Sequence, residues 1–482
     1  MKFLQNIRGK DAVTNISRLY MSQLISVGFS ILLSLYIPKF IGVKEFSYWQ
    51  LFLFYASYTG MLHLGLNDGL YLRYGGCILT DQECRSVSSQ LWVSCGIIAI
   101  LCGLAVTVVG LGMIPQLSNP NLIFVFCGVA VYAVVNIVYG FCGSLCQAIN
   151  RFKEYTNSYI IDRLIMAALL IAMVCMSIKR FEYIEVCWII SMFIVTFIML
   201  FRNRDIFLRK VSISEKTFQQ IGSNIGIGIN LMLSNVSSML IIGICNFFIS
   251  EHYPITTFGY VAFSLSLCNF ALLFISKIGI GIYPLLKKKK DEFHKVFFGK
   301  VDYLLTVLMP LSIVFFPILN LIVRYFLPNY YNSLEYLSIF FPLAVFSAKI
   351  EMLYSTYLKV LREERYLLRI NIYVMSLSMF LSAIGIYLLD NIPFTLICVS
   401  SCIILKACFM RNRINKIFKT TCHSLVIYSD IAFSIIYLVE IGVGVDFNIA
   451  VYSALFMSLI NIFFQRRHIK EDVRYLFIAR RN

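Results

Sequence analysis

Long apolar stretches alternate with short polar ones along the whole chain of 482 residues. Val87–Met113, Leu122–Ala148 and Val307–Phe326 are examples, and each reaches the ~20 residues that an α-helix needs to cross a hydrocarbon core. Such stretches predict spanning helices, because a helix satisfies its own backbone polar groups in lipid. The pattern predicts about fourteen transmembrane helices, at 14–40, 46–72, 87–113, 121–148, 156–178, 182–201, 221–249, 255–285, 301–326, 333–358, 367–389, 393–410, 424–443 and 446–464.

The composition agrees with an all-α polytopic membrane protein. Hydrophobic residues make up 59% of the chain and charged residues 14%, and a soluble domain could not hide that much apolar area. The net charge of +17 could indicate a nucleic-acid partner, but its placement favours a membrane. Of the 42 Lys and Arg, 32 fall in every second predicted loop or terminus. The positive-inside rule then places both termini on the cytoplasmic side of the membrane. We expect this membrane to be a bacterial inner membrane.

An internal repeat predicts the domain organisation. Phe46 and Tyr48, followed by a helix and Tyr71, are matched by Phe258 and Tyr260, followed by a helix and Tyr283. A duplicated six-helix unit explains this spacing, and an even number of helices keeps both copies parallel around a central cavity. The predicted parts are a six-helix lobe at 1–201, a cytoplasmic linker at 202–220, a second six-helix lobe at 221–410, two additional helices within 424–464 and a basic cytoplasmic tail at 465–482.

Cationic residues at membrane depth are the first candidates for a binding site, because burying charge in lipid is costly. Counted inward from the basic loops, four of them lie ten residues deep, roughly 15 Å into the membrane, and a fifth lies slightly shallower. A ring of such groups would bind a phosphate or pyrophosphate, which arginine holds in a bidentate manner. The predicted anion-binding residues are Arg18, His63, Arg163, Lys277 and Lys349.

A simpler interpretation is that these cations pair with acids. Asp162 adjoins Arg163, and Glu351 lies two residues from Lys349. Neither spacing puts both side chains on one helix face, so such pairing is expected between helices. Arg18 could instead extend to the cytoplasmic interface, and His63 could be a packing residue.

Acids at membrane depth are the candidates for ion coupling. Asp162 and Glu351 are the predicted carriers of a proton or sodium ion, and Asp68, close to a cytoplasmic end, could serve this role or pair with Arg73. No other cofactor is expected. The cysteines show no metal-ligand spacing, the chain carries no nucleotide-binding or hydrolase motif, and its outer connections are too short for an enzyme domain.

Several short motifs resemble a known family. The Gly-x-x-Glu-Phe element at Gly42–Phe46, the Leu-Gly-Leu-x-x-Gly element at Leu64–Gly69 and Tyr283-Pro284-Leu285 are similar to those of Wzx-type bacterial polysaccharide flippases, for O-antigen or capsule, in the MATE-like MOP superfamily. The resemblance implies translocation of undecaprenyl-pyrophosphate-linked oligosaccharides by alternating access. Similar flippases carry cations in the first, second and eighth helices. Arg18 and Lys277 fall on two of these, and the second helix offers His63 instead.

The leading hypothesis is therefore a flippase, a secondary transporter and not an enzyme, driven by an H⁺ or Na⁺ gradient. Its expected partners are the lipid-linked oligosaccharide, membrane lipids and polysaccharide assembly proteins, without nucleic acid. One alternative is a MATE-type drug or metabolite antiporter, which should line its cavity with acids. The other is a membrane polysaccharide polymerase, which would need a larger outer loop than this chain offers.

Overall fold

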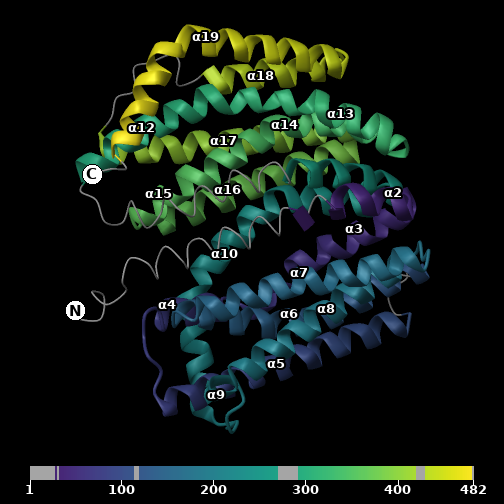
Figure 1. Cartoon of the computed structure of the whole chain (residues 1–482), viewed down its shortest axis with the longest axis vertical. Helices are drawn as coiled ribbons and strands as arrows, with labels where there is room; N and C mark the ends of the chain where they lie inside the picture. Colours follow the sequence, from purple (N-terminus) through teal and green to yellow (C-terminus); the bar gives the residue numbers. More distant parts are fainter. Residues whose placement is uncertain (1–27, 30–31, 113–118, 270–290, 420–428, 480–482) are drawn as a thin grey trace. The chain divides into compact units, whose positions relative to one another are not determined.

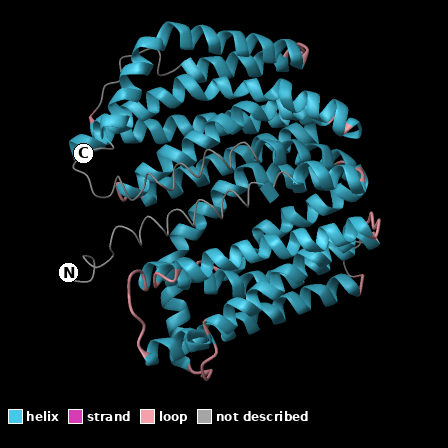
Figure 2. Ribbon diagram, in the orientation of Figure 1, coloured by secondary structure: helices cyan, strands magenta, loops and turns pink. Residues whose placement is uncertain are grey.

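The structure is a computed structural model that describes residues 28–29, 32–112, 119–269, 291–419 and 429–479. Helices and their short connections account for all of these residues, without a strand (Figure 2). Each of the fourteen predicted segments overlaps helical structure in the described ranges. Ten described helices are both long and apolar enough to cross a bilayer. The all-α prediction is confirmed, and the chain is a multi-pass membrane protein.

The chain divides into two compact units, Met1–Val236 and Ser237–Asn482, and the division falls inside one long helix, α10. The first part of α10 packs with the N-terminal helices, so the division between the compact units lies beyond the segment 202–220, and the predicted organisation of two six-helix lobes with a linker stays a prediction. Within 202–220 the structure has a short helix, α9, and the first turns of α10. The two C-terminal helices belong to the second compact unit.

The described helices of unit 1 form a layered bundle (Figure 1). Its central helix, α6, packs against α3, α4, α5 and α8. The elements are η1 (Leu32–Tyr36), α2 (Ile37–Ile41), α3 (Val43–Tyr58), η2 (Thr59–His63), α4 (Leu66–Arg73), α5 (Asp81–Gly110), α6 (Pro120–Ala148), α7 (Phe152–Cys175), α8 (Phe181–Arg202), α9 (Arg204–Phe207) and the first part of α10 (Glu215–His252).

Local sequence sets several of these helix ends. At the start of α5, the Thr80 side chain accepts the Glu83 N–H while the Glu83 side chain accepts the Thr80 N–H, a reciprocal cap that satisfies two donors left over at a helix start. At the start of α6, Asn119 precedes Pro120, whose fixed φ suits the first helical position. These caps begin the helices in the loops, outside the apolar stretches.

The second predicted helix, 46–72, is broken. It consists of α3, the 3₁₀ turn η2 and α4, with Leu64 and Gly65 in left-handed conformation between them. The backbone of α10 explains the break, because a Cβ on Gly65 would lie 2.8 Å from the carbonyl carbon of Gly228. Gly69 is closer still, since its Cβ would lie 1.9 Å from the carbonyl oxygen of Asn224. Two glycines therefore allow α4 and α10 to touch backbone to backbone.

Unit 2 is a second bundle, centred on α14 and α17, which pack against each other. A buried charge cluster joins its later helices, as described below. The elements after α10 are the helix Ile255–Asn269, α12 (Asp291–Leu308), η4 (Met309–Val314), α13 (Phe315–Phe326), η5 (Pro328–Tyr330), α14 (Ser333–Lys349), η6 (Ile350–Tyr354), α15 (Ser355–Val360), α16 (Glu364–Ala383), η7 (Ile384–Leu388), α17 (Ile392–Phe418), α18 (Ser429–Gly442) and α19 (Phe447–Ala479).

Candidate functional site

Arg163 lies at the middle of α7 and is surrounded by aromatic rings. Its guanidinium carbon is 5.3 Å from the ring centre of Phe29, 5.1 Å from that of Tyr159 and 5.3 Å from that of Trp188. Each distance is within the range of a cation–π interaction. The rings come from different helical segments, so the packing of unit 1 fixes the position of this cation.

The hydrogen bonds of this guanidinium are incomplete at one buried nitrogen. In the described part of the chain, Arg163 Nε has no hydrogen-bond partner, and its closest carboxylate oxygen, Asp162 Oδ2, is 3.8 Å away. Asp162 is turned toward α8, where Ser191 Oγ donates to its Oδ1 at 2.8 Å. The expectation that any acid pairing of Arg163 would be between helices is wrong, because its sequence neighbour supplies the weak contact.

The Arg163 site therefore consists of Phe29, Tyr159, Asp162, Arg163 and Trp188. The Arg163 side chain is 18% exposed, so a ligand can approach it. Rings hold the guanidinium in place, and its planar fork matches the oxygens of a phosphate group. A phosphate group at this place would form charge-assisted hydrogen bonds with the guanidinium, in place of the water that the cation lost on burial.

His63 has a local role at the helix break. Its Nδ1 accepts a hydrogen bond from the Gly65 N–H at 2.9 Å, which helps to hold the left-handed turn. Asp68 is half-buried in the first turn of α4. Arg73, at the other end of α4, donates to Asn224 Oδ1 at 2.9 Å. Asn224 in turn donates to Gln90 at 2.7 Å, so a polar network joins α4, α5 and α10.

Lys349 is fully buried in unit 2 and forms an ion pair with Asp430 of α18. Its Nζ also donates to Thr306 Oγ1 of α12 at 2.9 Å. This is the interhelical pairing that the sequence left open, although Glu351, the acid nearest in sequence, is exposed. An anion-binding role for Lys349 stays a prediction, and it requires this ion pair to open.

A second buried ion pair lies next to the first. Arg411 of α17 donates to Asp302 of α12 through Nε at 2.7 Å, and Tyr354 donates to the other oxygen of Asp302 at 2.7 Å. The Tyr354 ring also lies 5.9 Å from Lys349 Nζ. We call this group the buried charge cluster, and its members are Asp302, Thr306, Lys349, Tyr354, Arg411 and Asp430. It connects α12, α14, α17 and α18 through polar contacts that lipid cannot replace.

Three further charged residues of the spanning segments were missed from the sequence. Lys406 is buried in α17 and donates to Ser238 Oγ at 2.7 Å. Asp430 and Glu185 are buried acids of α18 and α8. The signal was present, since each is a charge within a predicted helix. Depth counting from basic loops was applied to cations at one level. Lys406 and Glu185 lie at other levels, whereas Asp430 lies at the level of Lys349, with which it pairs, and was missed because it is an acid.

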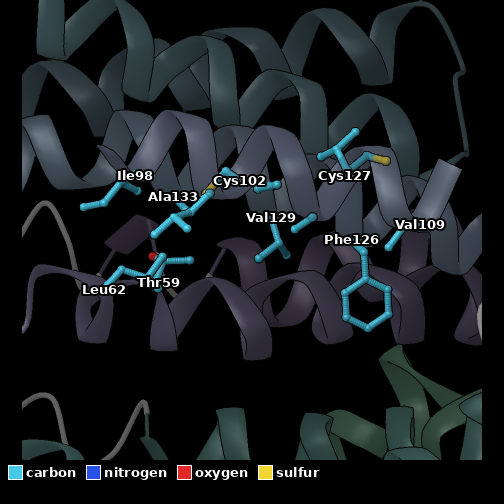
Figure 3. A pocket seen from close by; sticks show the side chains of 13 residues that line it. Thr59, Leu62, Ile98, Cys102, Val109, Phe126, Cys127, Val129 and Ala133 are labelled. Atoms are coloured by element: carbon cyan, nitrogen blue, oxygen red, sulfur yellow. The ribbon is translucent and has the colours of Figure 1, made fainter. Parts of the chain in front are cut away.

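Two predicted site residues, Arg18 and Lys277, lie outside the described residues. Among the residues that are described, no three His, Cys, Asp or Glu side chains come together as a metal site would require. A cavity of about 320 Å³ opens between η2, α5 and α6 (Figure 3). Its walls, from Thr59 and Leu62 to Phe126 and Ala133, carry no charge, so it offers nothing to hold a phosphate.

Comparisons with known proteins identify the fold of this chain. The chain matches no protein-family model, and its sequence matches no curated protein. Among solved structures, it is similar to the lipid II flippase MurJ in an inward closed conformation, with a TM-score of 0.67, 13% identity, and coverage of 95% of this chain and 100% of that one. An inward-facing multidrug resistance MATE family transporter of the MOP superfamily gives a TM-score of 0.60 at 11% identity, over 85% of this chain and 100% of that one.

A third similar structure is a MOP superfamily transporter from Pyrococcus furiosus, described as having a binding pocket of reverse polarity. It gives a TM-score of 0.51 at 14% identity, over 84% of this chain and 96% of that chain. At such low identity the likeness concerns the fold alone. The chain has the fold of MOP superfamily transporters.

Proposed function

We propose that this protein is a flippase that moves undecaprenyl-pyrophosphate-linked oligosaccharide repeat units across the bacterial cytoplasmic membrane by alternating access, for surface polysaccharide biosynthesis. The observation that carries the proposal is the Arg163 site. It is a partly exposed cation at the middle of a spanning helix, surrounded by aromatic rings, and its closest carboxylate oxygen among the described residues is 3.8 Å away. Cations kept at membrane depth are expected where an anionic group must pass.

The chemistry of the cargo suits this site. A pyrophosphate presents several oxygens to the Arg163 fork, and Tyr159 and Trp188 offer flat faces for the first sugar ring. The polyprenyl tail would stay in lipid, where the apolar faces of the spanning helices already belong. Arg18, His63, Lys277 and Lys349 are the further cationic residues that the sequence predicts for the headgroup.

The structural likeness fits a flippase and an antiporter alike, because proteins of both kinds share this fold. The lipid II flippase matches 95% of this chain and the MATE transporter 85%. Lipid II is named as the cargo of that flippase, and cargo of the same kind is proposed here. Since no nucleotide-binding motif occurs in the sequence, a gradient of H⁺ or Na⁺, or the membrane potential, is proposed to drive the cycle.

A MATE-type antiporter of cationic drugs is the rival, because it shares the fold. The two proposals differ in the charge of the cargo. An antiporter of cations should bind its substrate better when Arg163 is neutralised, since a positive group repels a positive substrate. A flippase of pyrophosphate-linked lipids should bind its substrate worse after the same change.

The test is transport by the purified protein in liposomes that contain a fluorescent lipid-linked oligosaccharide pyrophosphate. Arg163→Ala should lower the rate ~10-fold or more, because a charge-assisted hydrogen bond contributes ~1.5–3 kcal/mol. Arg163→Lys should keep part of the rate, as a point charge without the fork. Arg202→Ala is the matched control, since Arg202 is an exposed arginine at the end of α8.

Undiminished flipping by Arg163→Ala would overturn the assignment of the Arg163 site. Export of a cationic dye without flipping of the lipid would favour the antiporter.

A further inference from the structure

Glu185 is a carboxyl group sealed inside unit 1. It lies in the second turn of α8, its exposure is 0%, and neither of its carboxyl oxygens has a hydrogen-bond partner in the described ranges of the chain. Buried polar groups nearly always have a partner, so an unpartnered one calls for an explanation. Neither the Arg163 site nor the buried charge cluster includes this residue.

A glycine on the neighbouring helix makes room for this carboxyl. Helices α6 and α8 lie side by side in unit 1 (Figure 1). A Cβ built on Gly128 of α6 would lie 1.6 Å from Glu185 Oε1 and 2.7 Å from its Cδ. The carboxyl therefore occupies the space that any other residue at position 128 would fill. Such a fit excludes water from the acid while the two helices stay together.

The surroundings do not neutralise a negative charge at this place. Glu182, one turn earlier on the same helix, is another acid, and its own partner is Arg180. Among the described residues, α3, α6 and α7 present further titratable or charged groups toward α8. Glu45 accepts the Phe181 N–H, Tyr48 stacks on Phe181, and Cys127 lies on the facing side of α6. Tyr132 and the Asp162 and Arg163 pair lie near Trp188 and Ser191, and Glu154 pairs with Arg202 at the other end of α8. An ionised carboxylate without water or a partner costs several kcal/mol, whereas the neutral acid avoids this cost.

We propose that Glu185 is a proton-binding site of unit 1, which holds a proton while α6 and α8 are packed together and releases it when they separate enough to admit water. The proton comes from water and forms an O–H bond to one carboxyl oxygen, and on release it returns to water. Acid conditions therefore stabilise the packed state of α6 and α8, and alkaline conditions favour their separation. In the proposed flippase this change would couple cargo movement to a proton gradient, a consequence that rests on the proposed function.

The protonation is tested directly by infrared difference spectroscopy of the purified protein in H₂O and D₂O at neutral pH. A carbonyl band of a protonated carboxyl should be present, absent in Glu185→Gln and retained in Glu182→Gln. Glu182→Gln is the matched control, because it removes an acid one turn away that already has a cationic partner. A spectrum that Glu185→Gln leaves unchanged would overturn the proton site, whether or not the protein flips lipids.

The coupling is tested in liposomes with an imposed pH difference. The wild-type flipping rate should respond to the direction of the gradient, and Glu185→Gln, which cannot release a proton, should transport at a rate that no longer depends on it. A gradient response in Glu185→Gln equal to that of the wild type would refute coupling through this residue. If neither the wild type nor a variant flips the lipid but the infrared band follows Glu185, the proposed cargo is wrong and the proton site stands.

The space beside Gly128 of α6, which the Glu185 carboxyl fills, allows an independent test of this geometry that does not require transport. Gly128→Ala should lower the melting temperature in detergent, because its methyl group collides with the carboxyl. The same change in a Glu185→Ala background should cost far less, since the methyl group enters the vacated space. Equal losses in the two backgrounds would show that Glu185 does not occupy this gap and would overturn the geometry of the proposal.

Discussion

Replacing Lys349 by methionine tests whether the buried charge cluster holds the last helices on unit 2. The change keeps much of the side-chain length and removes the charge. Among the described residues, it leaves the Asp430 carboxylate, which is 1% exposed, with the Ile431 N–H at 2.9 Å as its hydrogen-bond donor. Thr306 loses its contact with the lysine. Removing one partner of a buried ion pair typically costs ~3–5 kcal/mol, because the other charge stays buried and unpaired.

That loss is a large fraction of the ~5–15 kcal/mol by which a folded domain is typically stable. Lys349→Met is therefore expected to extract from the membrane mainly as aggregate and to melt far below the wild type. Adding Asp430→Asn removes the stranded charge and keeps an oxygen for the Ile431 N–H. The double variant should recover at least half of the lost stability, because a neutral pair has no such desolvation cost.

The assay is the melting temperature and the monodisperse fraction of the purified protein in one detergent, for the wild type, both single variants and the double variant. A Lys349→Met protein as stable as the wild type would refute the structural role of the ion pair. A double variant as unstable as Lys349→Met would refute the charge argument and point to packing. Flipping by a stable double variant would show that Lys349 is not needed for the cargo, whereas a stable but inactive one would support its predicted anion-binding role.

Three further predictions concern other parts of the chain. Gly69→Ala should destabilise unit 1 by several kcal/mol, because its Cβ would lie 1.9 Å from a backbone oxygen of α10, while Gly60→Ala, with nothing within 4 Å, should melt like the wild type. Hydrogen bonds from Arg151 hold the pKa of Asp205 below its usual range, so this pair stabilises the protein above pH ~4 and the gain disappears as pH falls through the lowered pKa. Both side chains are more than a third exposed, so Asp205→Asn should cost no more than about 1 kcal/mol at pH 7 and nothing in acid, measured by melting at both pH values. Cys77 is exposed in the loop between α4 and α5, which the charge pattern places in the cytoplasm, and Cys175 is exposed at the opposite end of α7. In a Cys175→Ser background, Cys77 should therefore react with an impermeant maleimide in inverted membrane vesicles but not in intact cells, and labelling of Cys77 in intact cells would reverse the predicted orientation.

The positions of the helices were determined by the sequence. In a membrane, each spanning segment must be apolar over its own length and satisfy its own backbone, so local composition suffices to find it. This explains why all fourteen predicted segments overlap helices, including the two after residue 424. Depth counting also located Arg163 at the middle of its helix, because the rise per residue of a helix is constant.

Only the tertiary structure decided where those helices break and which charges meet. The apolar pattern of 46–72 is continuous, and its break at Leu64 and Gly65 depends on the close backbone of α10. Lys349 forms its ion pair with Asp430, which lies 81 residues later in the chain, and Glu185 packs against Gly128 on another helix. Such partners are set by the packing of segments distant in sequence, and no periodicity within a segment encodes them.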